Sequence, residues 1–364
     1  MFDAAMADDP YPTYAALREG SDVAYARENR VWIIHRHADV RRLLRDPAGF
    51  SSEMPAFEKT LLHADGERHR RARKALALSF SPAATRSREQ AIQRTVDEAL
   101  DRLEERVRGD VVADLAVPVP QTITGQMLGL AEPELAMLPR WADGITDRGE
   151  HRLAPLKEAR IFLREHLSGF TAREGAPEVA ALDAASGLSL GERVDLGVLL
   201  IAASVATTTS LIGSAVQMLM ADPGLTESLR REPGLAPQFI EEVLRFRAPI
   251  QRVRRIATYD TEVAGQPIPA GAAVVGLIGA ANRDPRVFSD ADEFQPFRQT
   301  KDHIAFGAGP HICIGLSLAR VEATLAIQAL VRRFSRIVSG PVVEMKHGLP
   351  GVFGPARLDI EVRV

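Results

Sequence analysis

The chain has 364 residues, a net charge of −3 and 46% hydrophobic residues, which is enough apolar content for a large core. The balanced charge argues against nucleic acid as the main partner, and no apolar run approaches the roughly eighteen residues of a membrane span. The start of the chain lacks the features of a signal peptide, so we expect a cytoplasmic protein with a reduced cysteine. No linker or repeat marks a boundary, and residues 1–364 are expected to form one domain.

The first half of the chain predicts a small β region followed by helices. Two short apolar runs flank Asn29 and predict a β-hairpin, with a helix over residues 37–45 behind it. Residues 66–108 are expected to be helical with a break at Pro82. Residues 131–190 form a polar, broken stretch.

The second half contains the longest predicted helix. A capping-box pattern begins at Ser189, and the helix can run from there to Pro223. Because it is apolar on most faces, it is expected to be buried through the middle of the protein. A second helix is expected between Pro237 and Pro249, and short strands and turns over residues 250–300. The fold class is therefore mainly α with small β-sheets.

Cys313 is the single cysteine, and it lies in the glycine-rich segment FGAGPHICIG. Glycine and proline on both sides bend the backbone tightly, and the residues that follow have the apolar spacing of a helix. Cys313 thus precedes a helix N-terminus, where free N–H groups and the helix dipole favour a thiolate. A small buried hydrophobic residue is the alternative, and the usual state of a free cysteine. The glycines and the helix start favour a metal-binding sulfur.

The cysteine segment resembles the haem-binding loop of the cytochrome P450 family, whose motif positions are taken here by Phe306, Gly307, His311, Cys313 and Gly315. The resemblance extends over nearly the whole chain. It implies a cytochrome P450-like fold with haem b held between the long central helix and the cysteine loop. Cys313 would then be the proximal axial ligand of the iron. His311 occupies a position at which many members carry arginine or histidine.

A Glu-x-x-Arg pair, Glu242 and Arg245, lies on one face of the second predicted helix. By themselves these residues would form an ordinary surface pair of little energetic value. The resemblance implies instead that Arg298 joins them in a buried cluster that fixes the core behind the haem loop.

The resemblance also implies partners for the two haem propionates, which need cationic or hydrogen-bonding groups. His69 and Arg73 share one helix, Arg255 opens a strand, and His303 precedes the cysteine loop. Each of them taken singly would be read as a solvated or satisfied polar residue. Together they form a candidate clamp for the two anionic groups.

Three further cations, Arg70, Arg71 and Lys74, lie on or near the helix of His69. By resemblance this is the proximal surface, where an acidic ferredoxin or flavodoxin would dock through electrostatic steering. A solvated helix face is the alternative. One cysteine cannot hold an iron–sulfur cluster, so the electrons are expected from a separate ferredoxin system.

The central helix departs from the family pattern at the distal side of the haem. The family has a glycine, an acid and a threonine that deliver protons to dioxygen, and this chain has Ser204, Ala206 and Thr207. Alanine cannot relay protons, so Thr207, Ser204, ordered water or a substrate carboxyl would carry them. Three functions stay open. They are a monooxygenase with a rerouted proton path, a non-standard oxidation (oxidative coupling, desaturation, nitration or nitric oxide reduction), and non-catalytic haem binding.

The substrate is the least readable part of the sequence. The resemblance places these residues at the distal pocket, with core packing as the alternative: Ala202, Ala203, Ile250, Gln251 and Phe353. The chain is shorter than the family norm in two regions that would form the lid, residues 50–63 and 131–190. We therefore expect a small hydrophobic or natural-product substrate, with room for a bulky or carrier-bound one.

Overall fold

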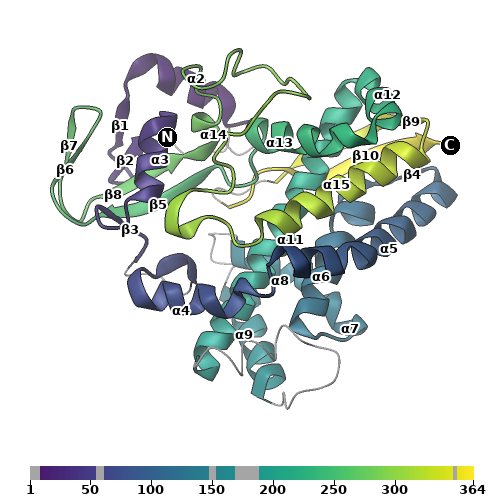
Figure 1. Ribbon diagram of the computed structural model, residues 1–364, viewed down its shortest axis with the longest axis horizontal. Coiled ribbons are helices and arrows are strands. Elements are labelled where there is room, and N and C mark those ends of the chain that lie inside the picture. Colours follow the sequence, from purple (N-terminus) through teal and green to yellow (C-terminus); the bar gives the residue numbers. More distant parts are fainter. Residues whose placement is uncertain (1–8, 55–60, 147–152, 169–187, 347–350) are drawn as a thin grey trace.

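A helix of 32 residues, α11 (Leu190–Ala221), runs through the centre of the computed structural model (Figure 1). Its capping box is present: Ser189 Oγ accepts from Glu192 N at 3.3 Å, and Ser189 N donates to Glu192 Oε2 at 2.9 Å. By length and composition α11 could cross a membrane, but 78% of its most apolar window is buried inside the protein. It therefore has the character of a core helix.

The structure describes residues 9–54, 61–146, 153–168, 188–346 and 351–364. Most of the described chain is helical. The other α-helices are α2 (Tyr11–Gly20), α3 (His37–Arg45), α4 (Gly66–Ala77), α5 (Pro82–Arg106), α6 (Pro118–Leu128), α7 (Glu132–Leu135), α8 (Leu138–Thr146), α9 (Leu153–Ser168), α12 (Pro223–Arg231), α13 (Ala236–Phe246), α14 (Ile278–Ala281) and α15 (Leu316–Arg333).

The strands form small sheets, the largest of which lies beside the helical region (Figure 1). They are β1 (Val23–Ala26), β2 (Val31–Ile34), β3 (Phe50–Ser51), β4 (Arg108–Asp110), β5 (Arg252–Ala257), β6 (Thr261–Val263), β7 (Gln266–Ile268), β8 (Ala273–Leu277), β9 (Arg336–Met345) and β10 (Pro355–Arg363). The sheet orders are β1-β2-β8-β5-β3, β4-β10-β9 and β6-β7. All pairs are antiparallel except β2 with β8.

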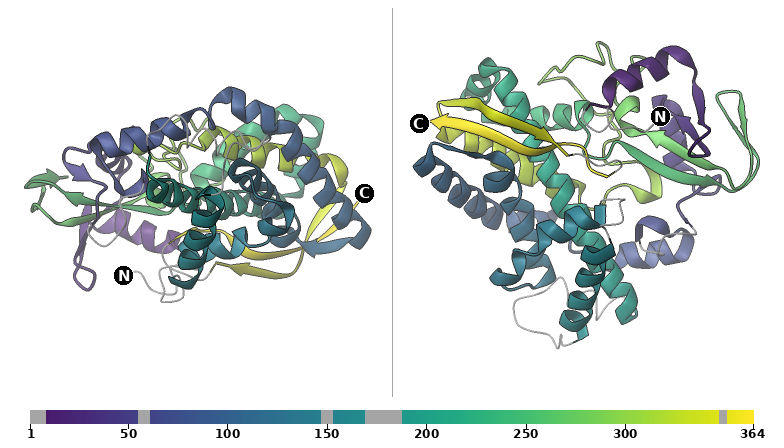
Figure 2. Two further views of the ribbon diagram at one scale, coloured as in Figure 1. Left: turned by 90° about the horizontal axis from the view of Figure 1, so that it is seen from below. Right: turned by 180° about the vertical axis from the view of Figure 1, so that it is seen from behind.

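Helix α15 packs against both α5 and α11, and the three helices contribute many residues to the main core. Strands β9 and β10 lie across this region when the molecule is seen from behind (Figure 2). A second apolar cluster fills the space between α2 and the five-stranded sheet. The mainly α architecture with small β-sheets that the sequence predicts is confirmed. The long helix therefore supports α15, the helix that follows the cysteine loop.

Local signals predicted several elements correctly. The hairpin is β1–β2, the helix over residues 37–45 is α3, and the break in the helical stretch 66–108 separates α4 from α5. Ser81 caps α5, because its Oγ accepts from Ala84 N at 3.2 Å. The helix after Cys313 is α15.

Other expectations were wrong or incomplete. The polar, broken stretch over residues 131–190 was not resolved into elements, and α7, α8 and α9 form there, with Trp141 of α8 only 1% exposed. Pro223 was taken as a helix end, but it also opens α12, whose first turn is capped by Asp222. Proline is well tolerated at this first position because its missing N–H would have no partner there. The β9–β10 pair was not predicted.

Candidate functional site

The cysteine loop, residues 306–315, is closed by backbone hydrogen bonds just ahead of α15. Cys313 N donates to Phe306 O at 2.9 Å, so the loop turns back on itself around the sulfur. Asn282 Oδ1 accepts from Ile304 N at 2.8 Å and holds the approach to the loop. These two hydrogen bonds hold the loop that carries Cys313 in one conformation.

Two glycines of this loop have left-handed backbone angles. Gly307 has φ +74° and Gly309 has φ +71°, a region in which side chains are strained. A Cβ at Gly309 would also lie 2.5 Å from the carbonyl oxygen of Leu44, at the end of α3. Position 309 therefore needs glycine both for its conformation and for the close approach of two backbones.

Opposing effects act on the pKa of the Cys313 thiol. Burial raises the pKa of the thiol, and the Gly315 N–H and the charges of Arg73 and Arg320 oppose that rise without cancelling it. The helix start alone, which the sequence offered as the reason for a thiolate, is therefore outweighed by burial. A thiolate here needs further positive charge beside the sulfur, such as a metal ion provides.

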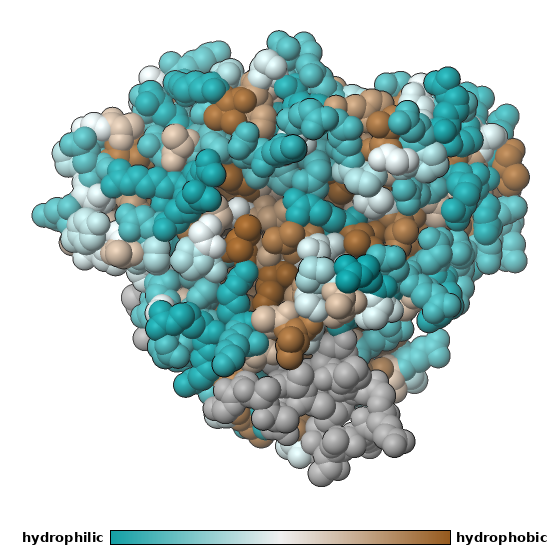
Figure 3. Space-filling model, viewed as in Figure 1, coloured by the Kyte–Doolittle hydropathy of each residue, from teal (hydrophilic) through white to brown (hydrophobic). Residues whose placement is uncertain are grey.

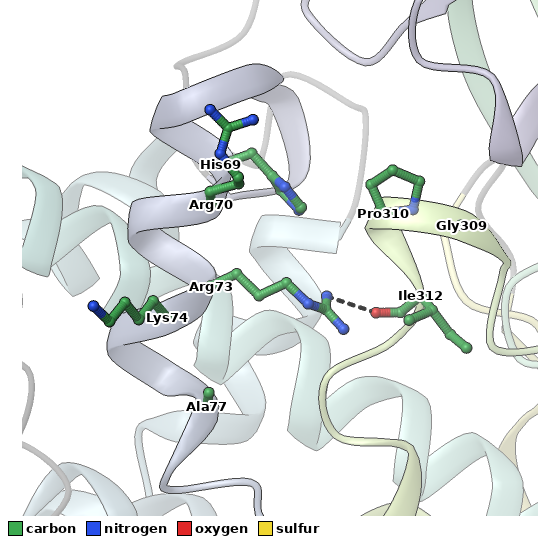
Figure 4. Close-up of a pocket in the computed structure, with 8 residues that line it drawn as sticks. All are labelled: His69, Arg70, Arg73, Lys74, Ala77, Gly309, Pro310 and Ile312. Carbon is green, nitrogen blue, oxygen red and sulfur yellow. Dashed lines mark hydrogen bonds between the residues drawn. The ribbon is translucent and has the colours of Figure 1, made fainter.

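A cleft of about 400 Å³ lies between α4 and the cysteine loop. Its lining includes His69, Arg73 and Ile312 (Figure 4). Arg73 reaches across from α4, and its Nη1 donates to Ile312 O at 2.7 Å. The buried Nε2 of His69 has no hydrogen-bond partner among the residues that the structure describes. An orphaned polar atom of this kind marks a place for a further hydrogen-bonding group.

His311 is held as a neutral side chain. Its Nε2 contacts Asp65 Oδ1 at 3.1 Å and Ser52 Oγ at 3.0 Å, and its ring lies 4.1 Å from that of His69. Burial lowers the pKa of His311 to about 4, despite the hydrogen bond to Asp65. At neutral pH His311 therefore orders the loop through hydrogen bonds and does not contribute a positive charge.

The two remaining predicted propionate partners, Arg255 and His303, differ in whether their side chains are free to bind a propionate. Arg255 is 6% exposed and donates from Nη1 to Arg254 O at 2.8 Å, and its pKa is lowered by burial. His303 is already engaged, because its Nε2 lies 3.0 Å from Glu241 Oε2 and its Nδ1 accepts from Ala305 N at 3.3 Å. Arg255 thus has unused donor capacity, whereas His303 would have to exchange a partner.

The Glu-x-x-Arg pair is fully buried. Arg245 donates to both oxygens of Glu242 at 2.7 Å, and each side chain is 0% exposed. Arg298 Nε joins them at 3.3 Å from Glu242 Oε1. The structure thus brings together the three residues that the resemblance groups, and arginine donors also bind backbone carbonyls of the segment 282–293.

The middle of α11 presents small side chains on one open face. Ala203 is exposed, and Ser204 and Thr207 are half-buried, although they lie in an otherwise buried helix. Thr207 Oγ1 donates back to the carbonyl of Ala203. Ala206 is only 1% exposed and points into packed core. Position 206, where the family carries an acid, therefore lies on the packed side of α11, one residue before Thr207 on the open face.

The other candidates for the substrate pocket lie mostly in packed surroundings. Ala202 is 6% exposed, Ile250 pairs with Val352 in a β-bridge, and Gln251 Nε2 donates to Ala248 O at 2.7 Å. Phe353 belongs to the second apolar cluster. Core packing accounts for these contacts, and their role at a pocket stays a prediction. Parts of the expected lid, residues 55–60, 147–152 and 169–187, lie outside the described residues.

Figure 3 shows a hollow near the middle of the molecular face that Figure 1 presents, with apolar residues at its base and polar residues around it. The donor set around the cysteine loop fits a haem. The half-buried sulfur of Cys313 could bind an iron, His69 and Arg255 have unused donors for propionates, and α11 offers small side chains. An apolar hollow suits a porphyrin ring.

Sequence reasoning missed several residues that shape the site. Asp65 organises His311, and Glu241 binds both His303 and Arg320. Glu322 is a carboxyl buried to 3% exposure on α15. A signal for Glu322 existed, because it shares a helix face with Leu318 and Ala326, where an acid is out of place. The acids in polar segments gave no such signal.

Comparisons with known proteins agree with this geometry. The family model described as Cytochrome P450 matches residues 178–357. The chain is 32% identical to cyclomarin C epoxidase CymV of Salinispora arenicola over 95% of this chain and 94% of that protein. The crystal structure of CYP109E1 from Bacillus megaterium with testosterone is 28% identical, covers 100% of both chains and has a TM-score of 0.93. P450BioI in complex with a fatty-acid-ligated acyl carrier protein is 26% identical, with a TM-score of 0.93 over 99% of this chain and 100% of that one.

Proposed function

This chain belongs to the cytochrome P450 family of haem-thiolate oxidoreductases, and from that premise we propose that it is a monooxygenase. Its substrate would be a small hydrophobic or natural-product-like molecule, its oxidant dioxygen, and its electron source a separate ferredoxin with its reductase. The observation that carries the proposal is the closed loop at Cys313, which lies across a cleft from the orphaned nitrogen of His69.

The residues of the chain would share the work of holding the cofactor. Cys313 Sγ would ligate the iron, and His69, Arg73 and Arg255 would bind the propionates. Gly307 and Gly309 let the loop turn without a side chain. Bound haem supplies the activation of dioxygen, which the protein side chains cannot perform.

The open face of α11 supports a roomy distal side. Ala203 and Ser204 occupy little volume, so a substrate could approach this helix closely. CYP109E1 is named with testosterone and P450BioI with an acyl carrier protein, which makes rigid polycyclic molecules and carrier-linked chains the classes to screen first. We place the reaction in the cytoplasm, where electron-transfer partners and reduced thiols coexist.

The basic surface on α4 supports docking of an acidic redox partner, with Lys74 as its main contributor. Arg70 and Arg71 are paired with Glu67 and Glu192, which reduces their contribution to the local field. Lys74 makes no ion pair within the described part of the chain. Lys74→Glu should therefore slow reduction by ferredoxin more at low salt than at high salt, with the absorption spectrum unchanged. Equal reduction rates at low salt would contradict docking at this surface.

The central experiment is the absorption spectrum of the reduced protein with carbon monoxide, which distinguishes thiolate from histidine ligation. Wild type should give the thiolate spectrum and Cys313→Ser should lose it. Compounds that shift the spectrum of the oxidised protein are then incubated with ferredoxin, its reductase and dioxygen, and the products are identified.

The result of this assay decides between the reactions left open by the sequence. An oxygenated product that incorporates labelled dioxygen supports a monooxygenase. A coupled or desaturated product without the label favours a non-standard oxidation. A thiolate spectrum without any turnover favours haem binding alone, and retention of that spectrum in Cys313→Ser would overturn the haem assignment itself.

A further inference from the structure

A partly buried ion pair lies against the start of the cysteine loop. Arg320 of α15 donates from Nε and Nη2 to the two carboxylate oxygens of Glu241 of α13. The side chains of Arg320 and Glu241 are 35% and 27% exposed, so solvent screens their charges less than those of a fully exposed pair. The two parallel hydrogen bonds also fix the orientation of the guanidinium.

The guanidinium of Arg320 contacts the cysteine loop at an aromatic ring. It lies 4.6 Å from the centre of the Phe306 ring, a distance at which a cation is attracted to the face of the ring. The backbone oxygen of Phe306 accepts from Cys313 N at 2.9 Å. One residue of the loop thus contacts Arg320 through its side chain and Cys313 through its backbone.

The charge of Arg320 acts on the sulfur of Cys313. Burial raises the pKa of the Cys313 thiol, and the charges of Arg73 and, after it, Arg320 are among the effects that oppose this rise. A cation that favours a thiolate over a thiol also favours the more negative of two charge states of a group bound to that sulfur. Arg73 is already assigned to a haem propionate, whereas the ion pair of Arg320 in the described part of the chain is with Glu241.

Glu241 opposes the effect of Arg320 with a charge of the other sign. Burial alone would raise the pKa of Glu241, but the hydrogen bonds from His303 and Arg320 lower it to about 2, so the carboxylate is ionised at neutral pH. The pair therefore carries one positive and one negative charge, with the positive group against the cysteine loop. Neutralising one member leaves the charge of the other uncompensated, so the two changes act on the sulfur in opposite directions.

We propose that the Glu241–Arg320 ion pair sets the reduction potential of the haem iron, with Arg320 favouring the reduced state and Glu241 orienting Arg320 and limiting its effect. The inference rests on the proposed function, since it concerns the electron that a ferredoxin supplies to the bound haem. Arg320 and Glu241 are positioning residues, and neither is assigned contact with the substrate or with the reacting atoms.

The step that the ion pair influences is the transfer of one electron. The electron passes from the ferredoxin, which is oxidised, to the haem iron, which is reduced, and no bond forms or breaks in the protein. The charge at the iron and its sulfur ligand becomes more negative by one unit. A cation beside the ligand stabilises this added charge and raises the potential, whereas a carboxylate lowers it.

The ordinary alternative is an ion pair that only joins α13 to α15, and matched variants separate the two roles. Arg320→Gln and Glu241→Gln each remove one charge, and glutamine at position 241 keeps an oxygen acceptor for His303. Arg320→Lys keeps the charge but loses the two parallel hydrogen bonds. Arg333→Gln is the control, because Arg333 is 30% exposed, is paired with two carboxylates and lies about 20 Å further along the same helix.

The measurement is a redox titration of the holoprotein without substrate or ferredoxin, after thermal unfolding and the carbon monoxide spectrum have shown that each variant is folded and keeps thiolate ligation. At a fixed applied potential, we expect Arg320→Gln to lower the ratio of reduced to oxidised protein by about 3- to 10-fold, and Glu241→Gln to raise it by a similar factor. A 10-fold change corresponds to about 59 mV in a one-electron potential. Arg320→Lys, Arg333→Gln and the double variant with glutamine at positions 241 and 320 should stay within about 2-fold of wild type.

A merely structural pair gives a different pattern of shifts. Shifts of Arg320→Gln and Glu241→Gln in the same direction, no shift in either, or an Arg320→Lys variant that behaves like Arg320→Gln overturn the proposal. If one glutamine variant does not bind haem, the sign of the shift in the other decides, and if neither binds haem the pair is a structural tether and the proposal fails. If wild type shows the thiolate spectrum but oxidises no compound, the proposed monooxygenase function fails, while the titration still decides about the ion pair.

Discussion

Arg320 of α15 holds Glu241 of α13 through two hydrogen bonds, from Nε to Oε1 at 2.6 Å and from Nη2 to Oε2 at 2.8 Å. Glu241 Oε2 also meets His303 Nε2 at 3.0 Å. The guanidinium of Arg320 lies 4.6 Å from the centre of the Phe306 ring, at the start of the cysteine loop. One carboxylate thus ties α13, the approach to the loop and α15 together.

Glu241→Gln should destabilise the protein at neutral pH by about 1–3 kcal/mol, because His303 and Arg320 lose their charged partner. Burial alone would raise the pKa of Glu241, but the hydrogen bonds from His303 and Arg320 lower it from 4.5 to about 2. The stabilisation is therefore complete above about pH 4.5 and is lost as the pH falls towards 2.

Thermal unfolding of wild type and Glu241→Gln between pH 2 and 8 measures this difference. Glu227→Gln is the control, since Glu227 forms an i,i+3 pair with Arg230 on the surface. A gap between wild type and Glu241→Gln that stays constant down to pH 2 would contradict the role given to the carboxylate.

Arg245→Lys should be strongly destabilising, by about 3–5 kcal/mol. A lysine cannot keep the two parallel bonds to Glu242 and also reach the carbonyls that Arg245 binds, so buried acceptors lose their donors. Arg231→Lys is the matched control, because Arg231 is an exposed i,i+4 partner of Glu227 at 3.8 Å and should change stability by less than about 0.5 kcal/mol. Chemical denaturation of both variants checks this, and similar midpoints would refute it.

Gly309→Ala should destabilise the protein by more than the strain of a left-handed backbone at position 309 alone explains. Gly271 also has positive φ, +77°, but a Cβ there meets nothing within 4 Å, so Gly271→Ala incurs only backbone strain of about 1–3 kcal/mol. At Gly309 the added Cβ would also collide with the backbone of Leu44 and push the cysteine loop away from α3. We expect Gly309→Ala to lose both stability and the thiolate carbon monoxide spectrum, and Gly271→Ala to keep the spectrum.

The elements that the sequence predicted well are those whose ends are marked by capping residues or proline, or whose apolar residues recur at helical spacing. The capping box at Ser189 and the break at Pro82 are short-range signals, and the apolar period after Cys313 needs no tertiary information. The helix end predicted at Pro223 is correct, but the same proline also begins α12, which was not predicted. The β9–β10 pair depends on a partner strand and contains irregular register, so its pattern was not visible locally.

At the site, too, local motifs could be predicted from the sequence, whereas properties that depend on tertiary packing could not. The loop motif located Cys313, and the resemblance grouped Glu242, Arg245 and Arg298, which are indeed in contact. Protonation states could not be read from the chain, because they depend on burial. His311 occupies a position at which many family members carry arginine, but burial lowers its pKa to about 4, which the sequence could not show.

Glu322→Gln should stabilise the protein, in contrast to Glu241→Gln. The pKa of Glu322 is raised from 4.5 to about 8, so the folded protein keeps a proton that the unfolded chain releases above pH 4.5. Folding therefore loses free energy as the pH rises from about 4.5 to 8, and glutamine, which carries no proton to retain, escapes this loss. The gain of the variant should grow over that range to a few kcal/mol at most and stay constant above it. Unfolding temperatures of both proteins between pH 4 and 9 measure it, and a variant less stable than wild type at pH 8 would mean that Glu322 is ionised in the folded state.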